Sequence, residues 1–319
     1  MCIYCRLSQR CPVTQYPVNV SASESLVCIG IFDGVHLGHQ ALVTSAKTAA
    51  THAGLSLTVC TFDPHPNAIV RPGYAPKSIS DLAHRKELLT QCGVDHVEVV
   101  SFTPELANLA PLEFSRDFLR DRLGAQIVWV GENFTYGRNG SGDAKTLTEN
   151  GIELGFLVQI FDLVQSGGTI SSTRIRELVG SGKVHLAAEM LGRNFILSGT
   201  VVRGDQRGRE LGYPTANLDW DDQLLVPADG VYAGYVIVSG DRLPAAISVG
   251  TNPQFQGRSQ RVEAYVLDRT DLELYGARVG VEFAEFIRSQ EVFGSLDDYL
   301  VQIAVDVATV SELLPPEPA

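Results

Sequence analysis

The chain has 319 residues, about twice the typical domain length of roughly 150 residues, so its length favours two domains. Hydrophobic residues make up 45% and charged residues 19%, which is typical of folded proteins and excludes a disordered or collagen-like chain. The formal net charge of -12 argues against a protein that binds nucleic acid non-specifically by neutralising phosphates.

Apolar runs alternate with segments of helical periodicity through the first half of the chain. They predict strands at residues 26–32, 55–62, 94–102, 126–131 and 156–161, and helices at about 38–52, 81–92 and 111–123. Apolar strands separated by helices favour a parallel sheet that is covered on both faces. Because such sheets bind ligands at the carboxyl ends of their strands, we expect the functional residues in the loops that follow strands.

From Phe195 the pattern changes to short alternating segments. They predict strands at residues 196–203, 231–238, 243–250, 261–267 and 277–283, with helices at about 181–191 and 295–314. The strands indicate an antiparallel sheet or small barrel. The charge changes near the same place, since residues 1–187 contain 15 basic and 17 acidic side chains whereas residues 188–319 contain 10 and 20. We therefore predict domains at 1–187 and 188–319.

The six cysteines do not indicate a disulfide scaffold in a chain of this size. Cys28 and Cys60 lie in apolar runs, so we expect them to be core residues. Cys2, Cys5 and Cys11 lie close together but lack a fourth ligand at zinc-site spacing, so we interpret them as part of a reduced N-terminus.

Targeting signals are also missing from the sequence. No run reaches the roughly 18 apolar residues of a membrane-spanning helix, and residues 1–20 lack the apolar core of a signal peptide. We therefore expect a cytoplasmic protein that binds neither membranes nor nucleic acid.

The first predicted strand leads into a glycine-rich turn and a helix. Gly30 and Gly34 let backbone approach a ligand closely, and the helix N-terminus offers free N–H groups to a phosphate. His36 and His39 are three residues apart, so they lie on one helix face, where both can donate to phosphate oxygens. An isolated histidine at a helix start is more often structural, but the pair in this context favours phosphate binding. We expect Asp33 to brace the turn rather than to bind a metal.

Two further polar motifs have a structural and a functional interpretation. Asp63 and His65, in the sequence DPHP after the second predicted strand, fit a simple turn and a ligand contact equally well. The serines and threonine at 171–173 are typical of a helix N-cap, and a capped helix N-terminus is also a phosphate site.

The sequence GIFDGVHLGHQ at 30–40 resembles the GxFDGVHxGH signature of nucleotidyltransferases, in the form found in prokaryotic bifunctional riboflavin kinase/FAD synthetases. Further blocks match that family in order: residues 61–66, Leu82 with Arg85, residues 131–137 and residues 170–176. The resemblance implies a Rossmann-like domain that transfers AMP from ATP to FMN and releases pyrophosphate.

The same resemblance implies roles for individual residues of this first domain. The implied ATP-binding residues are Gly30, Phe32, Gly34, His36, His39, Ser172, Thr173 and Arg176, with both histidines also catalytic. Asn133 is implied at the reacting groups or the flavin, and Asp63 is a second candidate for the flavin. Gly168 and Thr169 stand where some members of the family have an arginine, which puts one contact of the transferase site in question.

In the second half, residues 199–217 combine glycines, arginines and a Thr-Ala-Asn sequence. The glycines suit a loop that binds nucleotide phosphates, and the Thr215 hydroxyl and Asn217 carbonyl are oxygen ligands of the kind that Mg²⁺ accepts. The alternative is a hairpin with a proline turn.

This stretch resembles the flavokinase signature GxxxGRxLGYPTAN, and the match continues through residues 230–233, 250–253, 262–268 and 274–276 to Arg288 and Phe293. The resemblance implies a six-stranded antiparallel barrel that transfers the γ-phosphate of ATP to riboflavin. The residues implied for ATP are Gly204, Gly208, Arg209, Thr215 and Asn217, of which Thr215 and Asn217 also hold Mg²⁺. Arg288 is implied at the flavin.

Glu263 is implied as the base that accepts the proton of the attacking hydroxyl. A lone glutamate in a strand more often faces solvent, but its place in the motif favours catalysis. Gln254 stands where the family usually has threonine, which we interpret as tuning of the flavin side.

The sequence thus predicts an α/β protein with a parallel-sheet transferase domain, a β-barrel kinase domain and a terminal helix. We expect a bifunctional enzyme that converts riboflavin to FMN and FMN to FAD with ATP and Mg²⁺, without a tightly bound prosthetic group and with at most a weak or transient homo-oligomer. Two alternatives remain: an enzyme with one decayed site, suggested by the departures at 168–169 and 254, and a flavin sensor without turnover, which would not need Glu263 or the histidine pair.

Overall fold

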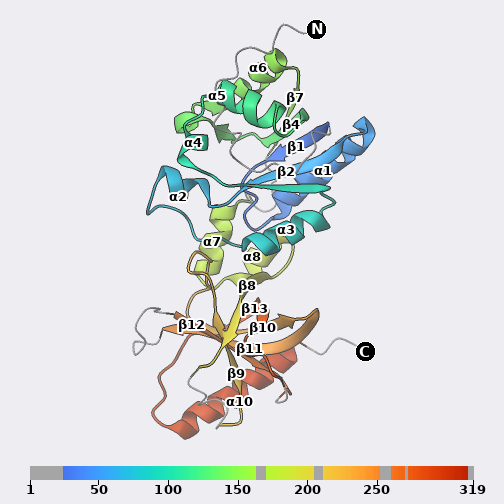
Figure 1. The fold of residues 1–319 in the computed structure, drawn as a ribbon. Helices are drawn as coiled ribbons and strands as arrows, with labels where there is room; N and C mark the ends of the chain where they lie inside the picture. Colours follow the sequence, from blue (N-terminus) through green and yellow to red (C-terminus); the bar gives the residue numbers. More distant parts are fainter. Residues whose placement is uncertain (1–23, 163–169, 205–210, 252–259, 270–271, 315–319) are drawn as a thin grey trace. The chain divides into compact units, whose positions relative to one another are not determined.

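The computed structural model describes residues 24–162, 170–204, 211–251, 260–269 and 272–314 (Figure 1). It divides into two compact units, which we call the sheet unit (residues 1–76 and 82–169) and the barrel unit (residues 77–81 and 170–319). The mixed α/β class that the sequence predicts is confirmed.

The sheet unit is built on five parallel strands in the order β3-β2-β1-β4-β7. Their bounds are β1 (Ser25–Ile29), β2 (Ser56–Phe62), β3 (His96–Val100), β4 (Ala125–Gly131) and β7 (Leu157–Phe161). All five predicted strands are present. β1 ends earlier than predicted because Gly30 already begins the turn that leads to α1.

Helices bury both faces of the central strands β1 and β2, whose residues are almost all buried, whereas the edge strands β3 and β7 are largely exposed or half-buried. Leu26 and Cys28 of β1 pack in a core with α1 (Leu37–Ala53) and α3 (Leu82–Gln91). The alternate residues Val27 and Ile29 face a second core, formed with the helices on the opposite side. Cys28 and Cys60 are fully buried, as predicted, and burial raises the pKa of both thiols.

The second core contains elements that the sequence analysis missed. The predicted helix 111–123 is a short α5 (Pro111–Glu113) followed by a π-helix, η2 (Phe114–Arg120). Helix α6 (Ala144–Leu154) was not predicted, although its signals are present: the Asp143 side chain accepts from the Thr146 N–H at 2.8 Å, and Gly155 ends the helix with φ 84°. The remaining short elements are α2 (Pro66–Val70), α4 (Pro104–Ala107), β5 (Thr135–Tyr136), η3 (Arg138–Gly140) and β6 (Gly142–Asp143).

The barrel unit contains a closed antiparallel barrel of six strands, which confirms the barrel that the resemblance implies, and the strand order is β10-β11-β12-β9-β8-β13. Its strands are β8 (Phe195–Val202), β9 (Thr215–Asp219), β10 (Gly230–Val238), β11 (Asp241–Thr251), β12 (Gln260–Val266) and β13 (Arg278–Arg288). Tyr232, Ile247 and Phe283 are among the fully buried residues of its core. Strand β9 was not among the predicted strands; it begins at Thr215 directly after Pro214.

The described residues of the barrel unit include the helices α7 (Ser172–Gly180), α8 (Val184–Leu191) and α10 (Leu296–Leu313). α10 confirms the predicted terminal helix. The helix predicted at 181–191 starts later, at Val184, because α7 ends at Gly180 and Gly182 adopts a φ of 77° between the two helices.

A short segment from the middle of the first half of the chain also packs in the barrel unit. The Ser78 N–H donates to the Gln223 carbonyl at 2.7 Å, and the Leu225 N–H donates to the Ser78 carbonyl at 2.8 Å. Ile79 is 3% exposed and belongs to the barrel core. The chain therefore contributes to the barrel unit before it has completed the sheet unit.

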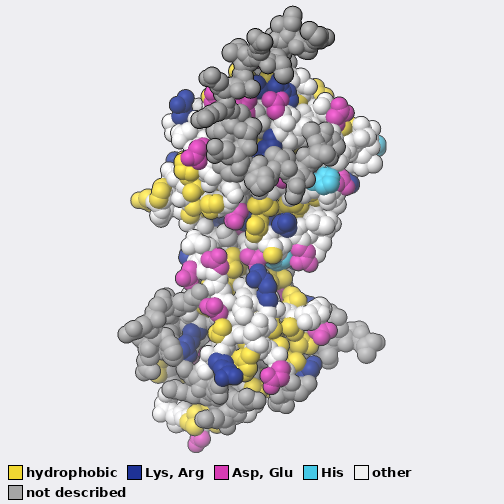
Figure 2. All heavy atoms as spheres, in the orientation of Figure 1, with side chains coloured by type: hydrophobic (Ala, Val, Ile, Leu, Met, Phe, Trp, Pro, Cys, Tyr) yellow, Lys and Arg dark blue, Asp and Glu magenta, His cyan; other side chains and the backbone are white. Residues whose placement is uncertain are grey.

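Charged side chains of both signs are interspersed among the described residues on the face shown in Figure 2. Within the described part of the chain, none of the helices has both the length and the apolar composition needed to cross a bilayer.

Candidate functional site

The turn after β1 adopts an unusual backbone. Gly34 has a φ of 76°, a conformation in which glycine is favoured. Phe32 and Val35 also have positive φ values, 51° and 38°, and such residues cost on the order of 1–3 kcal/mol each. Both side chains are buried, at 2% and 0% exposure, so packing stabilises the turn against this strain.

At Gly30, side-chain packing favours glycine, whereas at Gly34 the backbone conformation does. A Cβ there would lie 3.2 Å from Cε2 of Phe32, so its missing side chain makes room for the Phe32 ring. This is a packing role inside the turn, in addition to the ligand approach that we predicted from the sequence.

The two histidines lie together at the start of α1, as predicted. Nδ1 of His36 accepts from the His39 N–H at 3.3 Å and caps the helix, and the two rings stack with centroids 3.7 Å apart. Burial above all, then the charges of His36 and Arg85, lower the pKa of His39 well below its usual value. The buried Nδ1 of His39 has no hydrogen-bond partner among the described residues.

A network of buried polar side chains supports the glycine turn. Nη1 of Arg85, on α3, donates to the Phe62 carbonyl at 3.3 Å, and Nη2 lies 3.7 Å from Oδ1 of Asp33. The Thr61 hydroxyl donates to the Ile31 carbonyl at 2.7 Å. Arg85 and Asp33 are 5% and 2% exposed. Asp33 braces the turn, as expected, and Arg85 is the partner that makes this possible.

The strand order places these groups at a recognised binding position of parallel sheets. From β1 the chain adds β2 and β3 on one side, and then β4 and β7 on the other, so the direction reverses between β1 and β4. The glycine turn follows β1 and the exposed Asn133 follows β4. The exposed Asp63 follows β2, where its N–H donates to the Val100 carbonyl at 3.0 Å. The predicted site residues after β1, β2 and β4 therefore all lie at the carboxyl end of the sheet.

Other residues that the sequence predicts for the adenylyl transfer lie at the start of α7, in the barrel unit. Ser171 is the N-cap and accepts from the Arg174 N–H at 3.2 Å, so Ser172 and Thr173 are the first helical residues. Nε of Arg176 donates to the Lys77 carbonyl at 2.7 Å. In the DPHP sequence, Nδ1 of His65 accepts from the Asn67 N–H at 3.1 Å, which supports the structural interpretation of that histidine.

A second polar cluster forms on the barrel where β9 pairs with β12. Asn217 lies opposite Glu263, and the Thr215 hydroxyl donates to Oε2 of Glu263 at 3.4 Å across 48 residues of sequence. The alternate residues Val262 and Ala264 fill the barrel core, so the cluster lies on the outer face. The Glu263 side chain is 32% exposed, and Nη1 of Arg261 lies 3.8 Å from its Oε1.

Gly204 is part of the same arrangement. A Cβ at this position would lie 2.4 Å from Nδ2 of Asn217, so the observed position of the amide requires glycine at 204. The hydroxyl, amide and carboxylate oxygens fit a hard cation such as Mg²⁺. No group of three or more His, Cys, Asp or Glu side chains in the described residues could hold a metal. Gly208, Arg209 and Gln254, which the sequence analysis singled out, lie outside the described residues, as do Gly168 and Thr169.

Comparison with known proteins agrees with this architecture. The family model for FAD synthetase matches residues 19–174, and the model for riboflavin kinase matches residues 191–314. A bifunctional riboflavin kinase/FMN adenylyltransferase of Escherichia coli strain K12 is 36% identical over 289 residues, which are 90% of this chain and 92% of the relative. The chain belongs to the bifunctional riboflavin kinase/FMN adenylyltransferase family.

Further relatives support the assignment. The family member of Bacillus subtilis strain 168 is 33% identical over 287 residues, covering 89% of this chain and 90% of the relative. A crystal structure described as a macrolide-efflux protein from Streptococcus pneumoniae has a TM-score of 0.83 and 34% identity, and covers 91% of this chain and 95% of that one. The family models divide the chain into an FAD synthetase part that contains the histidine pair and a riboflavin kinase part that contains the Glu263 cluster.

Arg288, in the riboflavin kinase part, makes contacts that the sequence analysis did not anticipate. Its Nε and Nη2 donate to the two carboxylate oxygens of Asp306 on α10, at 2.9 and 2.7 Å. Its Nη1 donates to the Ser289 carbonyl at 3.0 Å. The side chain that the sequence analysis assigned to the flavin is thus bound to the terminal helix.

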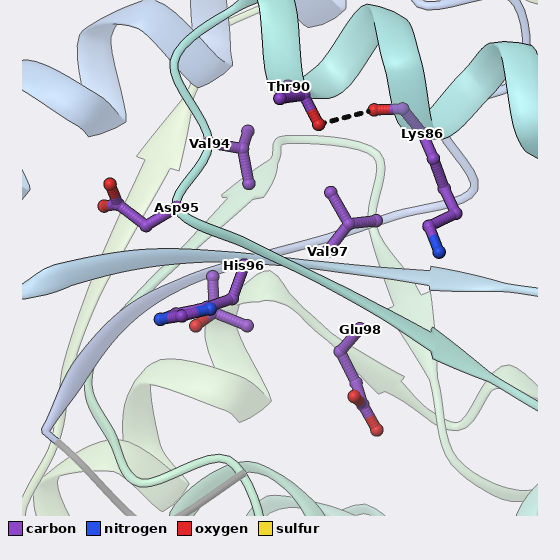
Figure 3. Close-up of a pocket in the computed structure, with 8 residues that line it drawn as sticks. Lys86, Thr90, Val94, Asp95, His96, Val97 and Glu98 are labelled. Carbon is purple, nitrogen blue, oxygen red and sulfur yellow. Dashed lines mark hydrogen bonds between the residues drawn. The ribbon is translucent and has the colours of Figure 1, made fainter. Parts of the chain in front are cut away.

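A cavity of about 320 Å³ in the sheet unit is lined by none of the residues of the histidine pair or the glycine turn (Figure 3). Its lining includes Asp95, His96 and Glu98 at the amino end of β3, and Lys86 and Thr90 of α3. Two of its charges are already paired, because Asp95 binds Lys47 at 2.6 Å and Glu98 binds Arg122 at 2.6 Å. Its location, at the opposite end of the strands from the histidine pair, does not fit the family's reaction.

Proposed function

We propose that this chain has two working sites, so that it converts riboflavin to FMN in the barrel and FMN to FAD with the histidine pair. The observation that carries the proposal is the contact of 3.4 Å between the Thr215 hydroxyl and Oε2 of Glu263, because it joins a phosphate-binding motif to a candidate base. A protein that only stores or senses flavin needs neither group.

In the kinase reaction, the 5′-hydroxyl of riboflavin attacks the γ-phosphorus of ATP. A new P–O bond forms to the ribityl oxygen, the bond to the β-phosphate oxygen breaks, and ADP leaves. Glu263 accepts the hydroxyl proton. The partial exposure of its side chain supports this role, since a base must be reachable by the substrate.

Thr215 and Asn217 are the residues that we propose to hold Mg²⁺, together with ATP phosphates. When bound, the cation neutralises charge on the phosphates. The Thr215 hydroxyl and the Asn217 carbonyl supply neutral oxygens beside the Glu263 carboxylate, and the absent side chain of Gly204 gives the Asn217 amide its room. Gly204, Gly208 and Arg209 are proposed to bind the ATP phosphates.

In the transferase reaction, an FMN phosphate oxygen attacks the α-phosphorus of ATP, and the bond to pyrophosphate breaks. His36 and His39, with the backbone of the glycine turn at Gly30, Phe32 and Gly34, are proposed to donate hydrogen bonds to the ATP phosphates. The lowered pKa of His39 supports a neutral donor there. Asn133 is proposed at the reacting groups, Asp63 at the flavin, and Ser172, Thr173 and Arg176 at the leaving pyrophosphate.

The experiment is a time course with purified protein, ATP and Mg²⁺, started in parallel from riboflavin and from FMN, with the three flavins separated by chromatography. We expect FAD from both starts. FMN as the final product from riboflavin, with no conversion of added FMN, would identify a kinase whose transferase site has decayed. FAD from added FMN alone would identify the reverse, and no turnover in either tube would favour the sensor.

The cytoplasmic location and the weak homo-oligomer stay predictions from the sequence, as does the boundary between the two activities at residues 187 and 188.

A further inference from the structure

Helix α10 lies against the outer face of the barrel (Figure 1). Val310 and Leu314, at its carboxyl end, form a core with Ala233 of β10, and Tyr265 of β12 packs against this core. Tyr265 is two residues from Glu263 on the same strand and therefore points to the same face. The helix thus covers the barrel surface beside the kinase cluster.

A buried ion pair attaches this helix to the barrel wall. Arg288, the last residue of β13, forms two parallel hydrogen bonds to Asp306, whose side chain is 7% exposed. Nε2 of Gln302 donates to the same carboxylate at 2.9 Å. A bidentate guanidinium–carboxylate pair defines both distance and orientation, so it sets the position of α10 more closely than apolar packing alone.

Tyr299 lies two helical turns before Asp306, on the same side of α10. Its ring is 5.5 Å from the ring of Phe293, which in turn lies 5.8 Å from the Arg288 guanidinium carbon. Partial burial first, and then the negative charge of Glu263, raise the pKa of Tyr299, as expected for a phenol that lies near that carboxylate. Because α10 also packs against Tyr265, two residues from Glu263 on β12, the residues Arg288, Asp306 and Tyr299 connect β13 to the surroundings of Glu263.

We propose that Arg288 is a positioning residue of the kinase reaction: by binding Asp306 it holds α10 where Tyr299 borders the site of Glu263. Arg288 then acts through the helix and not as a ligand of the flavin. Three of its five N–H groups already donate to Asp306 and Ser289, which supports this role. The inference rests on the proposed role of Glu263 as the base.

The barrel contains a matched control for this ion pair. Glu282 of β13 is 6% exposed and accepts from Nε and Nη2 of Arg242 at 2.9 and 2.8 Å. It also accepts from Nδ2 of Asn194 at 2.7 Å, as Asp306 accepts from Gln302. This second pair joins β11 to β13 within the barrel wall and has no role in the proposal. Asp306→Asn and Glu282→Gln therefore remove the same charge from equivalent buried pairs.

The test measures kcat and KM of riboflavin phosphorylation for both variants in the full chain, with FMN adenylylation as an internal control. We expect Asp306→Asn to lower kcat of the kinase by about 10- to 100-fold, because a catalytic group displaced by about 1 Å loses that much. Adenylylation of added FMN should stay near the parent rate. Glu282→Gln should lower thermal stability but leave kcat of the kinase within about twofold.

A double variant distinguishes positioning from flavin binding. If Arg288 acts through Asp306, Arg288→Ala combined with Asp306→Asn should be no slower than the slower single variant, since both remove one interaction. If Arg288 instead contacts the flavin, Arg288→Ala should raise KM for riboflavin while Asp306→Asn leaves both constants unchanged, and this result would overturn the proposal. Equal loss of kcat in Asp306→Asn and Glu282→Gln would overturn it too.

Should Asp306→Asn fail to fold, Tyr299→Leu tests the same connection at a residue that is 39% exposed. It should lower kcat of the kinase without changing adenylylation, and an unchanged kcat would contradict the proposal. Glu263→Gln separates this inference from the proposed function. If Glu263→Gln retains FMN formation, the proposed base is wrong, whereas an inactive Glu263→Gln with a fully active Asp306→Asn rejects only the positioning role.

Discussion

The two units present their candidate reactive groups in different ways. In the sheet unit, the polar groups come from loops at the carboxyl ends of strands, and the key residues of the glycine turn lie within ten positions of each other. In the barrel unit, Thr215, Asn217 and Glu263 project from within paired strands, and two strands distant in sequence must align before the cluster exists. The loop site therefore depends on local turn geometry, and the barrel site depends on register.

Glu263→Gln is the sharpest test of this comparison. We expect it to lower FMN formation by about 100- to 10,000-fold, because an amide cannot accept the hydroxyl proton. Conversion of added FMN to FAD should be unaffected, as measured by chromatography of the flavins. Loss of both activities together would show that the two reactions are not divided between the sites as proposed.

Replacing His36 and His39 together by alanine tests the loop site. The variant should accumulate FMN from riboflavin, with adenylylation slowed by about 100- to 1,000-fold through the loss of phosphate donors. The FMN and FAD peaks of the same reaction report both steps. FAD production at the parent rate would rule out the phosphate role of the histidine pair.

Gly204→Ala tests whether the barrel site depends on close packing around Asn217. The added Cβ would lie 2.4 Å from the amide nitrogen, so Asn217 must move, and we expect a 10- to 100-fold loss of kinase activity by the order-of-magnitude cost of misplacing a binding group. Gly180→Ala is the control, because a Cβ there meets nothing within 4 Å and alanine favours a helix. Equal kinase rates in the two variants would contradict the prediction.

The lowered pKa of His39 predicts a smaller effect on stability. Below the ordinary histidine pKa of about 6.5, the unfolded chain binds a proton that the folded chain excludes from His39, so acidification destabilises the fold. Between pH 7.5 and pH 5.5 the free energy of unfolding should therefore fall less in His39→Asn than in the parent, by at most about 1.4 kcal/mol per pH unit. Denaturant titrations at the two pH values measure this difference, and parallel losses in both proteins would refute it.

Individual residues show which features of the structure could be predicted from the sequence. The histidine pair, the bracing role of Asp33 and the core positions of Cys28 and Cys60 followed from turn chemistry, helical spacing and apolar runs, all of which act over short windows. Arg85 was recognised only as part of a family motif, because its partner Asp33 lies in the turn after β1 and far from it in sequence. Helix α6 had a usable signal in its capping residues, whereas the π-helix after Glu113 had none that we recognised.

By itself, the sequence determined the parallel sheet, an antiparallel sheet or barrel, and the terminal helix, because periodicity is a local property. The closed six-stranded barrel followed from the family resemblance, which contiguous motifs carry. Tertiary structure alone decided that Thr215 contacts Glu263, that Arg288 binds Asp306, that residues 77–81 join the barrel unit and that burial lowers the pKa of His39. Contacts of this kind depend on strand register and on burial, and both result from the packing of segments that are far apart in the chain.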